Sequence, residues 1–200
     1  MKGLLLKDFY FLFKQMKFFL LLVLIFAVLP QLSSSGFAIL YAALLPVTAL
    51  GYDQRSKWDQ FQLMLPCPVR DIVLEKYLFG GLLILVTALI SGCAKSIATA
   101  LDPNVVTGAV FPQLFFICCI AVIFLCMNLP VMFKFGVEKG RLFFIALVVI
   151  GVLTVGFFTE DVIRFINQNT ALLSFLPVLV AVLSVLVSIP LSIKLYNKNI

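Results

Sequence analysis

Five long stretches without a charged residue constrain this chain more than any other feature. They cover residues 18–52, 77–94, 105–133, 142–159 and 165–193. A helix needs about 20 apolar residues to cross the hydrocarbon core of a bilayer. The first stretch would form a helix of about 53 Å, which is too long for one crossing, so we expect it to fold back. The turn is expected at the polar sequence Ser33-Ser34-Ser35-Gly36.

The composition agrees with a membrane protein and not with a soluble domain. Hydrophobic residues make up 63% of the chain and charged residues 12%, whereas soluble chains carry roughly 25% charged residues. The sequence therefore predicts an all-α integral membrane protein that forms one domain over residues 1–200. Six transmembrane helices are expected, at residues 17–33, 37–52, 72–101, 105–133, 142–159 and 171–193.

The lysines and arginines predict the orientation of these spans. Of the 15 basic residues, all but Lys95 and Arg164 fall on one side of the six predicted helices. Basic residues accumulate on the cytoplasmic side of membrane proteins. Both termini are therefore expected to be cytoplasmic. The net charge of +6 is explained by this topology, and we do not expect nucleic-acid binding.

Residues 1–16 have their own pattern. Leu5, Phe9, Leu12 and Met16 recur at helical spacing, while charged residues lie elsewhere on the helix. This pattern predicts an amphipathic helix in the cytoplasmic interface. The alternative is an extension of the first span into the cytoplasm. A second short amphipathic helix is expected over residues 160–170, at the outer surface.

Residues 51–76 form the longest charged segment of the chain. Trp58, Phe61 and Leu65 are spaced along one helical face, and Asp53 with Lys57 makes a favourable i,i+4 pair. Prolines follow at 66 and 68 and force an end. We therefore predict a cytoplasmic helix over residues 53–65, which either docks a protein or lies flat on lipid.

Several kinds of chemistry lack the residues they need. The chain has no histidine, and four of its five cysteines fall inside predicted spans without metal-ligand spacing. The second inner loop, residues 130–141, lacks the Gly-x-x-x-x-Gly-Lys-Ser/Thr pattern of a phosphate-binding loop. We therefore expect no enzyme activity and no cofactor in this chain.

The charged segment resembles a loop of a known family. Small ABC-2 type transporter permeases of Gram-positive bacteria have, between spans two and three, an acid, Ser-x-Trp, an aromatic, Leu-Pro-x-x-Arg and Ile-Val…Lys-Tyr. Residues 52–77 match with Asp53, Ser56, Trp58, Phe61, Leu65, Pro66, Arg70, Ile72, Val73, Lys76 and Tyr77. The second inner loop is similar to the family as well.

The resemblance implies a function and partners. In such permeases the first loop is a coupling helix that sits in a cleft of an ATP-binding cassette subunit. It implies a permease dimer, expected to be a homodimer, that works with two ATPase copies, which would bind ATP and Mg²⁺. The complex would lie in a bacterial plasma membrane. It would export amphipathic or antimicrobial-type peptides such as phenol-soluble modulins. The coupling residues would be Asp53, Arg55, Ser56, Trp58, Phe61, Leu65 and Pro66, with Lys134, Glu138, Lys139 and Arg141 of the second inner loop.

One alternative function has the same topology. A six-span substrate-capture subunit of a vitamin-type uptake system would need small-residue faces on the first span, which residues 18–32 lack.

Four further residues carry local predictions. We predict that Lys95 snorkels to the outer interface and that Asn128 bonds a neighbouring helix. Asp71 is expected as the N-cap of span three, and Pro112 and Pro130 as break points in span four.

Overall fold

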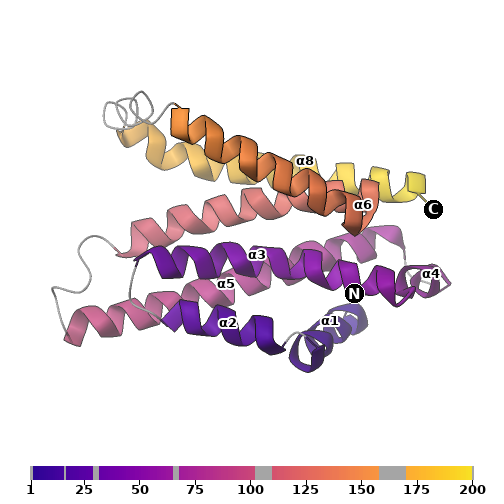
Figure 1. The fold of residues 1–200 in the computed structure, drawn as a ribbon, viewed down its shortest axis with the longest axis horizontal. Coiled ribbons are helices and arrows are strands. Elements are labelled where there is room, and N and C mark those ends of the chain that lie inside the picture. Colours follow the sequence, from indigo (N-terminus) through magenta and orange to yellow (C-terminus); the bar gives the residue numbers. More distant parts are fainter. Residues whose placement is uncertain are drawn as a thin grey trace.

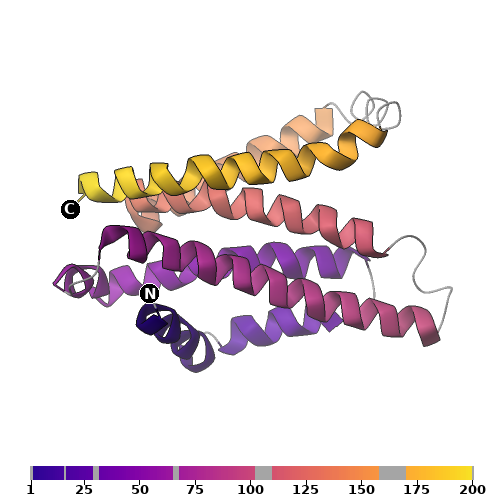
Figure 2. The ribbon, with the colours of Figure 1, turned by 180° about the vertical axis from the view of Figure 1, so that it is seen from behind.

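The chain folds as a bundle of long helices. The computed structural model describes residues 2–15, 17–28, 32–64, 68–101, 110–157 and 170–199, and no strand occurs among them. The long helices lie side by side, with the shorter ones at one end and along one flank (Figures 1 and 2). They are α1 (Lys2–Gln15), α2 (Lys17–Val28), α3 (Leu32–Arg55), α4 (Trp58–Leu63), α5 (Val69–Leu101), α6 (Val110–Phe157) and α8 (Thr170–Asn199).

Four helices are long and apolar enough to cross a membrane. These segments are Gly36–Arg55, Val69–Ala100, Pro112–Gly140 and Pro177–Asn197. The pair α1 and α2, bent by 81°, would add a fifth if it forms one broken span. A multi-pass helical membrane protein is thus confirmed, while the six-span count stays a prediction. The predicted fifth span lies largely in the second part of α6, where only the backbone is described, and residues 160–169 lie outside the described part.

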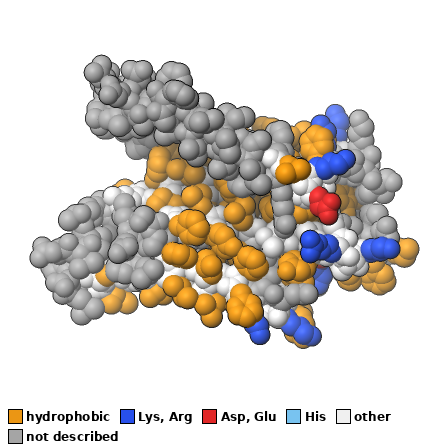
Figure 3. Space-filling view, viewed as in Figure 1, with side chains coloured by type: hydrophobic (Ala, Val, Ile, Leu, Met, Phe, Trp, Pro, Cys, Tyr) orange, Lys and Arg blue, Asp and Glu red, His pale blue; other side chains and the backbone are white. Residues whose placement is uncertain are grey.

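The core is formed where α3, α5 and α6 meet. Ile39, Val73 and Leu125, one from each helix, belong to a single buried apolar cluster, and α8 packs against α6 and α5. The opposite faces remain apolar and exposed, as for Leu85 on α5 and Leu186 on α8. In Figure 3 hydrophobic side chains cover the middle of the visible face, as expected of helices that meet lipid.

The start of the third span differs from the prediction. The helix α5 begins at Val69 and includes Asp71 in its first turn. The backbone N–H of Asp71 donates to the carbonyl of Pro68 at 2.9 Å. Asp71 is therefore inside the helix and is not its N-cap. A proline has no N–H to satisfy, so the segment can turn helical directly after Pro68.

The break in the fourth span also lies elsewhere than predicted. Pro112 is in the first turn of α6, where proline is tolerated, and Pro130 is inside a continuous helix. The break is at Gly136, which has φ 76° and ψ 168°. Beyond it the chain turns back so closely that a Cβ on Gly140 would meet the Sδ atom of Met132 at 2.4 Å. The predicted second inner loop is thus a corner between two helical segments.

A hydroxyl of α8 explains why the helix continues through Pro130. Proline lacks the N–H that would bond the carbonyl four residues earlier, which belongs to Cys126. The Oγ of Ser188 donates to this carbonyl at 2.6 Å. Because Ser188 has one hydroxyl hydrogen, Tyr77 of α5 must donate its own to Ser188 Oγ at 2.5 Å. Ser192 lies 2.7 Å from the same phenol oxygen, so one network joins three helices.

Two polar residues inside spans depart from the sequence prediction. The side-chain amide of Asn128 donates to the carbonyl of Phe124 in its own helix at 3.0 Å, and not to a neighbouring helix. Lys95 does not snorkel, because its side chain is 0% exposed. Lys95 faces the interior of the bundle, on the side of α5 that carries Ile84 and Ala88 of the core.

We expect the substitution Ser188→Ala to destabilise the protein by about 1–3 kcal/mol, because it leaves the buried Cys126 carbonyl without its donor and removes one of the two hydroxyl partners of the Tyr77 phenol. Ser96→Ala is the matched control, since the exposed Ser96 hydroxyl donates only to Gly92 of its own helix, and should change stability by less than about 0.5 kcal/mol. Equilibrium unfolding in detergent micelles measures both. Equal effects of the two substitutions would contradict the role assigned to Ser188.

Candidate functional site

The charged groups of the molecule gather at one end of the bundle. The helix α4 and the C-terminus lie there in both ribbon views (Figures 1 and 2). In the space-filling view the Lys and Arg side chains lie toward this same end (Figure 3). We call it the charged end. It brings together both segments in which the sequence predicts coupling residues.

Five ionisable side chains meet inside the charged end. The Nζ of Lys76 lies 2.6 Å from Asp8 Oδ2 and 2.8 Å from Asp53 Oδ2. The Nζ of Lys7 lies 2.9 Å from Asp53 and 3.0 Å from Asp8. Glu75 completes the group, with its Oε1 3.9 Å from Lys76 Nζ. These residues, which we call the ionic cluster, come from α1, α3 and α5.

The ionic cluster is shielded from solvent. Glu75, Asp8 and Lys76 are 0%, 1% and 2% exposed. Attraction between opposite charges is much stronger at such a site than in water. Removing one partner of a buried ion pair is correspondingly costly, because the remaining charge is left without compensation. The cluster therefore holds α1, the end of α3 and the first part of α5 in one arrangement.

The predicted coupling helix over residues 53–65 is divided in two. Asp53 and Arg55 belong to the end of α3, a turn follows, and α4 covers only Trp58–Leu63. Lys57 is in the left-handed region with φ 56°, which ends α3. The hydroxyl of Ser56 donates to the Asp53 carbonyl at 3.1 Å and supports this turn. The predicted pair of Asp53 with Lys57 is wrong, because Asp53 is bound to Lys7 and Lys76 instead.

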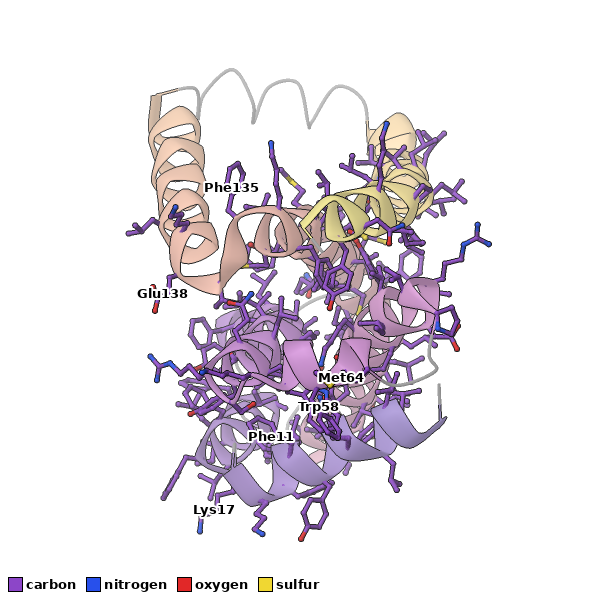
Figure 4. All side chains as sticks on the ribbon, turned by 90° about the vertical axis from the view of Figure 1, so that its right-hand side faces the viewer. Phe11, Lys17, Trp58, Met64, Phe135 and Glu138 are labelled. Carbon is purple, nitrogen blue, oxygen red and sulfur yellow. The ribbon has the colours of Figure 1, made fainter. Side chains whose placement is uncertain are left out.

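The aromatic stripe of the sequence is also split. Trp58 is half-buried, and the ammonium of Lys7 lies 5.0 Å from its ring centre. Phe61 is 54% exposed and Met64 is 82% exposed. Seen along the bundle axis, Trp58 lies between α4 and α1 (Figure 4). Trp58 thus fixes α4 to the bundle, and among the described side chains of this segment Phe61 and the C-cap residue Met64 are the exposed apolar ones.

The second inner segment lies beside the end of α3. The backbone N–H of Val137, directly after the corner at Gly136, donates to the Gln54 side chain at 2.9 Å. Next to this contact is a cavity of about 520 Å³, whose lining includes Arg55, Glu138 and Lys139. Figure 4 shows Phe135 and Glu138 at this corner. The structure therefore joins the two predicted coupling segments through one hydrogen bond.

The remaining predicted residues are placed as follows. Lys134 is exposed, and its ammonium lies 4.7 Å from the ring centre of Phe135. Leu65, Pro66 and the side chain of Arg141 lie outside the described residues.

Sequence reasoning did not predict the ionic cluster. Its signal was the presence of adjacent acid–base pairs, Lys7-Asp8 and Glu75-Lys76, within otherwise apolar helical faces. Charges at such positions are expected to be paired when the helices are buried. The paired charges lie far apart in the sequence. Lys7 and Asp53 are 46 positions apart, and Lys76 and Asp8 are 68 positions apart. The spacing of residues in the sequence does not show which of them come into contact.

Comparison with known proteins gives one match. The model of a family described as ABC-2 family transporter protein matches residues 3–197. No curated protein and no solved structure matches the sequence. The matched region includes the ionic cluster, α4 and the corner at Gly136.

Replacing Lys76 by methionine should destabilise the protein by about 3–5 kcal/mol, because Asp8 and Asp53 lose their buried counter-ion. Lys7→Met is the control for net charge. It removes one ammonium as well, but this ammonium is 25% exposed, so we expect a smaller loss. Equilibrium unfolding in detergent compares the two variants. The assignment of Lys76 as the central cation fails if Lys7→Met is the more damaging change.

Gly136→Ala should cost about 1–3 kcal/mol, because a φ of 76° with a ψ of 168° is a conformation that residues other than glycine avoid. Gly81→Ala is the control, since Gly81 lies in α5 with nothing within 4 Å of an added Cβ. We expect Gly81→Ala to be neutral or stabilising by up to about 1 kcal/mol. Thermal unfolding in detergent provides the measurement. An unchanged midpoint for Gly136→Ala would contradict the backbone conformation assigned to Gly136.

Proposed function

Because this chain belongs to the ABC-2 family of transporter proteins, we propose that it works as the permease subunit of an ABC exporter. Family membership makes it a transport component of the membrane that associates with an ATPase subunit. We further propose that α4 is the coupling helix on which this ATPase docks. The surface of α4 is the observation that supports docking.

The exposed side chains described at α4 are apolar, and α4 lies at the tip of the charged end (Figure 1). Phe61 lies on α4, a helix of six residues that is too short to cross a membrane, and Met64 is its C-cap residue. Phe61 and Met64 are 54% and 82% exposed. Aromatic residues and methionine are enriched where proteins bind each other. A buried aromatic anchor in a partner's cleft commonly provides much of the binding energy. Phe61 is the residue that we assign to this position.

The support beneath α4 suits the transmission of movement. Trp58 packs against Lys7, and Lys7 is bound to Asp53 at the end of α3. Asp53 is bound in turn to Lys76 in α5. A force applied to α4 would therefore act on α1, α3 and α5 together, as rigid elements that shift at an interface. We assign the polar corner with Arg55, Glu138 and Lys139 to the rim of the same docking surface.

The remaining parts of the proposal follow from the resemblance of residues 52–77 to small exporter permeases. We propose a homodimer with two ATPase subunits that bind ATP and Mg²⁺, in a bacterial plasma membrane with both termini cytoplasmic. The substrate class we propose is an amphipathic or antimicrobial-type peptide. The family match favours this function over a vitamin-type substrate-capture subunit.

The substitution Phe61→Asp should weaken binding of the partner ATPase subunit by about thirtyfold, since loss of an interface anchor costs about 2 kcal/mol. Phe61→Leu keeps an apolar side chain and serves as the matched control, with a much smaller loss. Co-purification and ATPase stimulation in proteoliposomes measure the effect. Docking through α4 is wrong if Phe61→Asp binds and stimulates the ATPase as the wild type does, with membrane insertion equal in both.

A further inference from the structure

Lys95 is a buried cation without a partner among the described residues. Its side chain is 0% exposed, and its Nζ has no hydrogen-bond acceptor among the described residues. One helical turn earlier, Ser91 is also 0% exposed, and no described residue bonds its hydroxyl. Residues four apart lie on one face of a helix. Two unsatisfied hydrogen-bonding side chains therefore stand next to each other inside the bundle.

Three other side chains of the same helix that donate hydrogen bonds have acceptors, whereas the buried carboxylate of Glu75 accepts no hydrogen bond from a described residue. Lys76, the second buried lysine of α5, is bound to two carboxylates. The hydroxyl of Thr87 donates to the carbonyls of Leu83 and Ile84. Ser96 donates to the carbonyl of Gly92. The fold thus supplies acceptors along α5 except at Ser91 and Lys95.

Burying Lys95 without an acceptor has a large energetic cost. An ammonium group carries three hydrogen-bond donors and accepts none. Burying it without an acceptor costs several kcal/mol. Ionisable residues inside membrane-spanning helices that face the bundle interior mark binding sites and pathways. Lys95 meets this description, because it continues the inner face of α5 formed by Ile84 and Ala88.

The residues around Lys95 indicate what kind of molecule could reach it. Lys95 lies six residues before the end of α5 at Leu101, about 9 Å along the axis. This is the end of α5 opposite to the charged end. The neighbouring surface is apolar: Leu114 of α6 lies 3.5 Å from the position of a Cβ on Gly92, and Leu89 and Ile97 are exposed on the outer side of α5. A molecule that reaches Lys95 therefore has an apolar body.

We propose that Lys95 and Ser91 bind the anionic head of an amphipathic molecule, through its carboxylate or phosphate oxygens. Both side chains can donate to such oxygens, and hydrogen bonds that involve charge are the stronger ones. Since Lys95 is fully covered here, the head reaches it when α5 and α6 separate at this end of the bundle. The role of the bound molecule as cargo rests on the proposed function, whereas its binding does not require an ATPase.

A fluorescence titration tests the site. The full-length protein is placed in phosphatidylcholine nanodiscs and titrated with 11-(dansylamino)undecanoic acid, or with the uncharged amide of the same chain. We expect the wild type to bind the acid about tenfold more tightly than the amide, as a charge-assisted hydrogen bond provides. Lys95→Met and Lys95→Gln should bind the two probes about equally, and Lys95→Arg should retain the preference. Ser91→Ala should reduce it.

The control is Lys14→Met, which removes an exposed lysine of α1 and should keep the wild-type ratio. Lys95→Met replaces a buried charge by an apolar group of similar volume, so it is expected to fold. Gel filtration verifies folding for each variant. The site does not exist as proposed if both Lys95→Met and Lys95→Gln keep the preference for the acid.

A second arm identifies the source of the anion. Nanodiscs with phosphatidylglycerol should weaken probe binding to the wild type, but not to Lys95→Met, if a lipid phosphate occupies the site. Unchanged binding assigns the site to a carboxylate amphiphile that is not a bilayer lipid. Failure of the proposed function is seen separately, because Phe61→Asp should weaken ATPase docking without altering the ratio of the two probes.

Discussion

The bond between Lys76 and its two carboxylates is the interaction on which the charged end depends. Acceptors around a buried ammonium offset the cost of removing it from water, and those of Lys76 come from Asp8 of α1 and Asp53 of α3. Once these three side chains are in place, α3 has to end near Asp53, and α4 follows after the turn at Lys57. The position of Trp58 over Lys7 depends on the same arrangement.

The helix-breaking residues show how packing overrides a local preference. Pro130 leaves the Cys126 carbonyl without its helical donor, yet the helix continues because Ser188 of α8 donates to that carbonyl. Gly136 carries a weaker sequence signal, but the chain breaks there, with the Gln54 side chain bonding the next backbone N–H. A break therefore occurs where a neighbouring helix supports it.

The two buried lysines of α5 show that the same residue type can have different roles in one helix. Lys76 is surrounded by carboxylates of its own chain and acts as a joint between helices. Lys95 has no acceptor within the described part of the chain. In the sequence Lys76 follows Glu75, whereas Lys95 has no charged neighbour, but neither pattern shows which groups surround the ammonium. Only the neighbouring helices distinguish a structural ion pair from a cation that is left to bind something else.

The sequence by itself determined the helical membrane class, the long spans of α3, α5, α6 and α8, and the short helix at Trp58, because hydropathy and helical spacing are local properties. It also carried the family resemblance. The tertiary structure alone decided that Trp58 faces inward while Phe61 faces outward, that α6 breaks at Gly136, and that Lys95 is buried. These features depend on contacts between residues far apart in the chain, such as Asp8 with Lys76, and no local pattern specifies which partners meet.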